Sequence, residues 1–171
     1  MKQPISMYDA SVPVFKQLLT ALIAILDKAQ THIVEHSIKP DILLQASLYP
    51  DMFNLIRQVQ VASDFAKSVT ARLAGVDVPA YEDNETNFAE LKARIEKTLL
   101  FISSIKHEEI NGSEDKEIIT RPGTPKEKKF SGQSYLLHYG LPQFFFHVTT
   151  AYDILRNQGV AIGKRDYMGA F

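Results

Sequence analysis

The sequence contains no cysteine, which excludes disulfide bonds, a thiol nucleophile and any metal site built from thiolates. It also has no excess of basic residues. The formal net charge is −1, so the charge does not indicate binding to nucleic acid or to an anionic membrane surface. The longest apolar run, LLTALIAIL, has nine residues, whereas a membrane-spanning helix requires about 20. We therefore expect no transmembrane segment.

The remaining composition is that of a globular domain. The 171 residues are 45% apolar and 23% charged, which is typical of a soluble protein with a single hydrophobic core. We predict one domain over residues 1–171. The first residues, MKQPISMYDAS, lack the apolar stretch of a signal peptide. Together with the lack of cysteine, this favours a cytoplasmic protein.

Four segments place apolar residues at steps of three and four, which is the spacing of one helix face. Gly140 and Pro142 predict a kink inside the last of them, and residues 160–171, which show no period, are predicted to form a loop. The expected helices run from a cap at Ser6 to about Ser37, from YPDMF to Gly75, from Asn87 to Ile105, and from Ser131 to Gly159.

A polar stretch separates the third and fourth helices. Within it, KEIIT and KEKKF flank the turn sequence RPGTP, so we predict a small β-hairpin between these two helices. A hairpin alone is marginally stable, and this one must therefore lie on the helices. The expected fold class is all-α, a four-helix bundle with a hairpin or irregular insert.

The segment HIVEH has the H-x-x-E-H form of one class of zinc proteases. His32 and His36 lie on one helix face and Glu35 would act as a base, but a third ligand must come from elsewhere. The nearest acids after the third helix, Glu108 and Glu109, lie in polar loop sequence. We interpret HIVEH as an exposed helix end, with histidines near the negative end of the helix dipole.

The fourth helix contains three consecutive phenylalanines, residues 144–146, which cover about 200° of its circumference. This predicts either the most buried helix of the bundle or a dimer interface. His147 shares a stripe with Phe144, Ala151 and Ile154, so its ring should be buried. A buried imidazole requires hydrogen-bond partners, or a metal ion, for its nitrogens.

A row of polar residues follows the second helix. Arg57, Gln60, Asp64 and Lys67 recur at three- and four-residue steps. They form either a solvated face with paired charges or the polar wall of a pocket. Gln58 lies beside the apolar stripe and is expected to point inward.

Three segments carry a resemblance to a known family: SMYDASVPVF, PDMFNLIRQVQVASDFAKSVTARLAG and LPQFFFHVTTAYDILRNQGVAIGKRDYMG. They resemble a bacterial and fungal family catalogued as a domain of unknown function and placed with the DinB/YfiT-like metalloenzyme superfamily. The resemblance covers nearly the whole chain and implies a four-helix bundle. It also implies a metal site with one histidine on the second helix and an H-x-x-x-H pair on the last.

Carried over by position, these ligands fall on Gln58, His147 and Ala151. His147 alone is a good donor, whereas tight sites need three or four. We therefore expect no tightly bound cofactor and at most a weakly held zinc or nickel ion. Together with Asp64, Tyr152 and Asp153, Gln58 and His147 are the predicted pocket residues.

The expected function is that of a small-molecule-binding or stress-related accessory protein. We expect a homodimer without nucleic acid or membrane partners. The alternative is a metal-dependent hydrolase or thiol-cofactor transferase that uses His147. A third interpretation, a purely structural dimer module, predicts no pocket.

Overall fold

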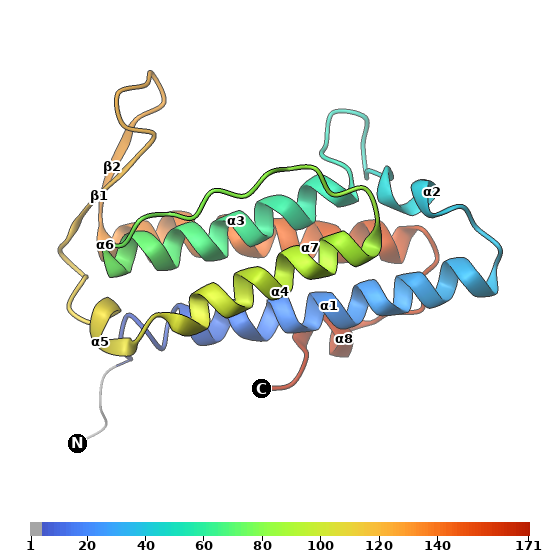
Figure 1. Cartoon of the computed structure of the whole chain (residues 1–171), viewed down its shortest axis with the longest axis horizontal. Helices are drawn as coiled ribbons and strands as arrows, with labels where there is room; N and C mark the ends of the chain where they lie inside the picture. The colour runs from blue at the N-terminus through green and yellow to red at the C-terminus, as the bar shows by residue number, and fades with distance from the viewer. Residues whose placement is uncertain (1–4) are drawn as a thin grey trace.

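A computed structural model describes residues 5–171; the first four residues of the predicted domain lie outside it. The predicted four-helix bundle is confirmed, because four long helices pack side by side (Figure 1). These are α1 (Val12–Glu35), α3 (Leu55–Ala74), α4 (Phe88–Ser104) and α7 (Leu141–Asn157). The shorter elements are α2 (Pro40–Leu44), α5 (His107–Ile110), α6 (Gly132–Ser134), the π-helix η1 (Tyr135–Gly140) and α8 (Lys164–Met168).

The connection between α3 and α4 is unusual for a bundle. Both helices run in the same direction, and α1 and α7 run in the opposite one (Figure 1). The chain must therefore travel back along the bundle after α3. Residues 76–87, which form no helix or strand, make this return; we call them the strap. Irregular segments of about this length in a compact domain commonly have a role of their own.

The core lies between the apolar stripes of the four long helices. Phe15 of α1 and Phe144 of α7 meet edge to face, with ring centroids 4.8 Å apart, and both are fully buried. Burying each such side chain contributes roughly 1.5–3 kcal/mol. At Gly140, an added Cβ would lie only 2.7 Å from a methyl of Val69, so glycine allows the end of η1 to approach α3. These contacts hold α7 against α3, where the candidate site lies.

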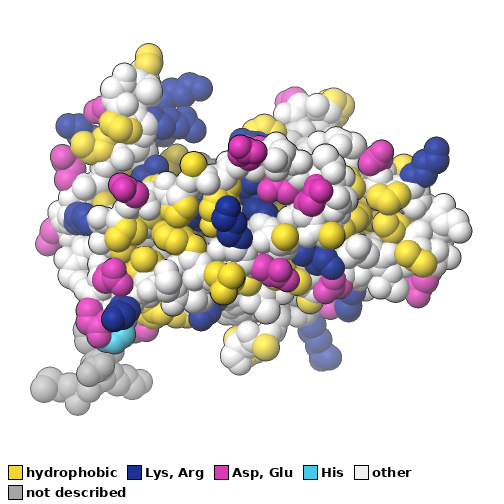
Figure 2. Space-filling view, in the orientation of Figure 1, with side chains coloured by type: hydrophobic (Ala, Val, Ile, Leu, Met, Phe, Trp, Pro, Cys, Tyr) yellow, Lys and Arg dark blue, Asp and Glu magenta, His cyan; other side chains and the backbone are white. Residues whose placement is uncertain are grey.

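The predicted hairpin is also confirmed. Strand β1 (Glu117–Thr120) pairs antiparallel with β2 (Lys128–Ser131), and Ile118 lies opposite Phe130. The buried side chain of Ile118 anchors the hairpin to the helices. Its tip projects from one end of the bundle (Figure 1), and Figure 2 shows Lys and Arg side chains gathered on it.

Three boundaries differ from the prediction. Helix α1 begins at Val12, because Ser6 and Asp9 bond each other in a separate turn before it. Helix α3 begins at Leu55, where the Asn54 side chain accepts a hydrogen bond from the Arg57 amide. The tail contains α8 where a loop was predicted, since a five-residue helix is too short to show a period.

The phenylalanine run is less buried than predicted. Phe144 is fully buried, but Phe145 is 37% exposed and Phe146 is 54% exposed. The expectation that α7 is covered on several sides within one chain is therefore wrong. Its outer side, which carries these two rings, faces solvent in the single chain.

Over residues 5–171, no helix has both the length and the apolar character needed to cross a membrane.

Candidate functional site

Gln58 of α3 and His147 of α7 meet where these two helices face each other. Nδ1 of His147 lies 2.7 Å from Oε1 of Gln58. His147 is 6% exposed and Gln58 is 1% exposed, so this hydrogen bond is shielded from water. The predicted burial of His147 and its closeness to Gln58 are confirmed. The two helices do juxtapose the positions that the resemblance aligned.

The hydrogen bonds of Gln58 determine where the proton of His147 lies. The Gln58 amide nitrogen donates to the backbone carbonyl of Phe53 at 3.2 Å, so the amide oxygen faces the imidazole. An amide oxygen only accepts hydrogen bonds, and Nδ1 of His147 must therefore be the donor. A neutral imidazole with its hydrogen on Nδ1 has a lone pair on Nε2. His147 thus presents a hydrogen-bond acceptor.

Aromatic rings surround this imidazole. Phe65 and Phe53 lie nearly parallel to it, with centroids 5.9 and 6.4 Å away, and Phe146 meets it edge-on at 5.2 Å. Phe53 and Phe146 are about half exposed. Two of the three rings around the imidazole therefore lie at the protein surface.

The electrostatics keep this imidazole neutral. Burial, and to a smaller extent the positive charge of Arg57, together lower the pKa of His147 to about 4. The guanidinium of Arg57 lies over the Phe53 ring, 5.7 Å from its centroid, on the approach to the imidazole. At neutral pH His147 is therefore uncharged.

The residues present do not fit the three-ligand metal pattern of the superfamily. Ala151, which takes the place of the second histidine of the pair, is fully buried and has no donor atom. The oxygen of Gln58 already accepts the hydrogen of His147. Between residues 5 and 171, no three His, Asp or Glu side chains come together in a group able to hold a metal ion. Of the three ligand positions, only Nε2 of His147 offers a lone pair to a metal ion.

Comparison with known proteins agrees with this fold. The family described as a domain of unknown function, DUF1993, matches residues 7–168. The chain belongs to this family. It is similar to the crystal structure of a DinB family member from Shewanella denitrificans, with 38% sequence identity and a TM-score of 0.90. That match covers 96% of this chain and 92% of the other. A search of curated proteins finds no match.

Asp64, predicted as a pocket residue, instead belongs to a second polar cluster of this DUF1993 chain. Its carboxylate contacts Arg94 and Lys67, each at 2.9 Å. Arg94 also bonds Asp83 and Glu85, each at 2.9 Å, and is only 4% exposed. Asp83 and Glu85 are strap residues, so Arg94 ties the strap to α3 and α4.

The polar row of α3 lies beneath the strap. Gln60 and Lys67 are both 4% exposed, and the solvated-face interpretation is wrong for them. The Gln60 amide donates to Glu85 at 2.8 Å, and the Lys67 ammonium lies 3.8 Å from the centroid of the Tyr81 ring. Arg57, at the end of the row, pairs with Asp83 of the strap. Gln60 and Lys67 are therefore buried under the strap, whereas Arg57 is partly exposed and also lies over Phe53 beside His147.

Tyr152 and Asp153 also lie away from His147. They follow it by five and six residues, which turns them well over 90° around α7. The Tyr152 ring instead meets Tyr167 of α8, with centroids 5.9 Å apart. Tyr152 and Asp153 line a cavity of about 200 Å³ together with Thr149, Lys164 and Tyr167. The structure therefore brings His147 and Gln58 together, whereas Asp64, Tyr152 and Asp153 lie away from this pair.

Sequence reasoning did not identify the aromatic partners of His147. Phe65 lies seven residues after Gln58, on the same helix face, and this spacing could have indicated it. Phe53 precedes α3, where no helical period applies. Phe146 also lines a cavity of about 230 Å³ with His138, Tyr139, Pro142 and Gln143, so the aromatic surround borders a hollow.

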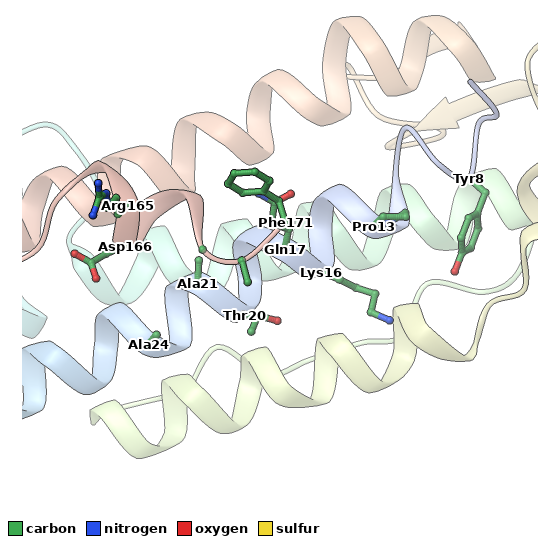
Figure 3. A pocket seen from close by; sticks show the side chains of 12 residues that line it. Tyr8, Pro13, Lys16, Gln17, Thr20, Ala21, Ala24, Arg165, Asp166 and Phe171 are labelled. Atoms are coloured by element: carbon green, nitrogen blue, oxygen red, sulfur yellow. The ribbon is translucent and has the colours of Figure 1, made fainter. Parts of the chain in front are cut away.

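A larger cavity than either of these lies elsewhere. It has a volume of about 750 Å³ and lies between α1 and the C-terminal segment (Figure 3). Thr20, Ala21 and Ala24 of α1 lie along it, and Arg165, Asp166 and Phe171 come from the C-terminal segment. Neither Gln58 nor His147 lines it.

Proposed function

We propose that this DUF1993 protein binds a small, largely apolar organic molecule at His147 and holds no metal ion tightly. The observation that carries the proposal is the buried hydrogen bond from Nδ1 of His147 to Gln58, which leaves Nε2 as an acceptor. The ligand would donate an N–H or O–H to this nitrogen. The role proposed for the protein is therefore that of an accessory protein that binds a ligand, and not that of a catalyst.

The surroundings of the imidazole support this ligand class. Among residues 5–171, Nε2 of His147 has no hydrogen-bond partner, and it is not one of the fully buried unpartnered atoms, so a donor group of a ligand can reach it. Three phenylalanine rings present apolar faces and edges around it. Phe53 and Phe146 are half exposed, and rotation of these side chains would admit a ligand without backbone movement.

The donor atoms support the absence of a tight metal. For Gln58 to become a ligand, its oxygen would have to leave Nδ1 of His147, and that buried N–H would lose its partner at a cost of about 1–3 kcal/mol. Ala151 supplies no donor. The hydrolase or transferase alternative would require ligands that this position lacks.

A fragment screen by NMR tests the proposal. We would use small aromatic amides and phenols and follow the ring resonances of His147. Binding that shifts these resonances and is lost in His147→Phe is the expected result. Tyr152→Phe is the matched control, because that residue lines a different cavity. Hits that bind the His147→Phe variant equally well, or a screen without hits at His147, would contradict the proposal and favour the structural module.

We also propose that the protein is a homodimer. Support comes from Phe145 and Phe146, two adjacent rings on the outer side of α7 that are exposed in a single chain. Large exposed aromatic side chains side by side commonly mark a contact surface. Sedimentation equilibrium of the full chain measures the state directly.

A further inference from the structure

The end of α1 carries two histidine rings that the proposed function does not use. The rings of His32 and His36 lie 4.3 Å apart between centroids, with 36° between their planes. We propose that this pair is a weak binding site for a divalent transition metal ion such as Ni²⁺, Cu²⁺ or Zn²⁺. The site is independent of His147 and is not the protease centre that H-x-x-E-H suggests.

The hydrogen bonding of His36 prepares it as a ligand. Its Nδ1 lies 2.9 Å from the backbone carbonyl oxygen of His32. A carbonyl oxygen only accepts, so Nδ1 carries the hydrogen and Nε2 has the lone pair. Metal-binding histidines characteristically donate their other N–H to a carbonyl or carboxylate in this way. His36 is exposed, and an ion can reach its Nε2 from solvent.

The ring of His32 is partly exposed. It lies beside Gly159, just after α7, and a Cβ added at Gly159 would be 3.8 Å from Cε1 and 3.9 Å from Nε2. Glycine has no side chain, so nothing from residue 159 fills this space. Because the two histidines are four residues apart on one helix face, their Nε2 atoms can serve one ion.

The position of the pair favours a cation. Helix α1 ends at Glu35 with His36 as its cap, and α7 ends at Asn157, two residues before Gly159. Both helices run in the same direction, so both C-termini lie at this end of the bundle (Figure 1). Helix C-termini carry a partial negative charge of about half an elementary charge each. Two of them therefore meet near the histidine pair.

The donor set defines the class and strength of binding. Imidazole ligands suit Zn²⁺, Ni²⁺ and Cu²⁺, and Cu²⁺ should bind most tightly. Over residues 5–171 no third His, Asp or Glu completes the site. Glu108 and Glu109 are residues of α5, which lies at the opposite end of the bundle (Figure 1). Water would fill the remaining positions, so the ion exchanges readily.

Calorimetric titration of the full chain with NiCl2, and separately with ZnCl2, tests this site. We expect about one ion per chain, and His32→Ala and His36→Ala should each weaken binding about tenfold or more. His107→Ala, which removes another exposed histidine, and His147→Phe should leave the affinity within about twofold. Neither His32 nor His36 is buried, and a melting curve confirms that the variants fold. No binding by the unmodified chain, unchanged affinity in either variant, or loss in His147→Phe would overturn the proposal.

Discussion

Replacing Arg94 by methionine should destabilise the protein strongly. Its guanidinium bonds three carboxylates, those of Asp64, Asp83 and Glu85, each at 2.9 Å, while its side chain is almost fully buried. Methionine preserves most of the volume but leaves these carboxylates close together with fewer cations. Removing one partner of a fully buried ion pair costs about 3–5 kcal/mol, which is an upper bound here because Asp64 and Asp83 are each more than a third exposed. That is a large part of a total stability of about 5–15 kcal/mol.

Chemical and thermal unfolding measure this effect. For a chain of this size, about 3–5 kcal/mol corresponds to a fall in Tm of roughly 6–20 °C. Hydrogen exchange should also accelerate in the strap, residues 76–87, because Arg94 holds two of its carboxylates. Lys97→Met is the matched control. Lys97 is exposed and lies 4.2 Å from the Tyr81 ring centroid, a contact worth about 0.5–1 kcal/mol.

A third variant separates the charge from the packing. Arg94→Met combined with Asp64→Asn and Glu85→Gln removes two of the stranded carboxylates and should recover part of the lost stability. If Arg94→Met unfolds no more easily than Lys97→Met, the idea that a buried ion cluster holds the strap is refuted.

Three further outcomes are expected. Folding lowers the pKa of His147 from 6.5 to about 4, so the unfolded chain binds this proton first as the pH falls. The free energy of unfolding should therefore be unaffected above pH 6.5 and decrease by up to about 3 kcal/mol between pH 6.5 and pH 4. Urea unfolding across this range should show the loss in the unmodified chain and not in His147→Phe. Phe144→Ala should cost about 3–5 kcal/mol, whereas Phe146→Ala should cost much less and make melting depend on protein concentration if that ring lies in a dimer; equal losses at every concentration would contradict this. Gln58→His with Ala151→His should create a zinc or nickel site beside His147 detectable by elemental analysis, and no added metal would show that the three positions do not converge.

Helical periodicity predicted the bundle because each long helix buries one continuous stripe. It also placed His147 and Gln58 inward, and the resemblance aligned the two helices correctly. Phe146 was not predicted correctly, since only Phe144 of the three consecutive phenylalanines lies on the buried side of α7. An apolar residue on the outer side of a helix looks the same in sequence as one in a core.

The strap cluster was not predicted, for a different reason. Asp83 and Glu85 precede α4 in a segment without helical or strand periodicity, and both pair with Arg94 of α4. The contacts of this cluster join residues far apart in the chain: Gln60 and Glu85 are 25 positions apart, and Asp64 and Arg94 are 30 positions apart. No local period carries such information. The polar row of α3 was therefore compatible with a solvated face or with the wall of a pocket, and the sequence did not indicate that the strap covers Gln60 and Lys67.

The most direct test of the account is the proton position on His147. A long-range ¹H–¹⁵N spectrum of the full chain at pH 7 distinguishes a protonated from an unprotonated ring nitrogen. We predict a neutral ring with hydrogen on Nδ1, no hydrogen on Nε2, and no change in either nitrogen after one equivalent of Zn²⁺ is added. A hydrogen on Nε2, or a zinc-induced shift of His147, would contradict the proposal that this imidazole is an acceptor for an organic ligand.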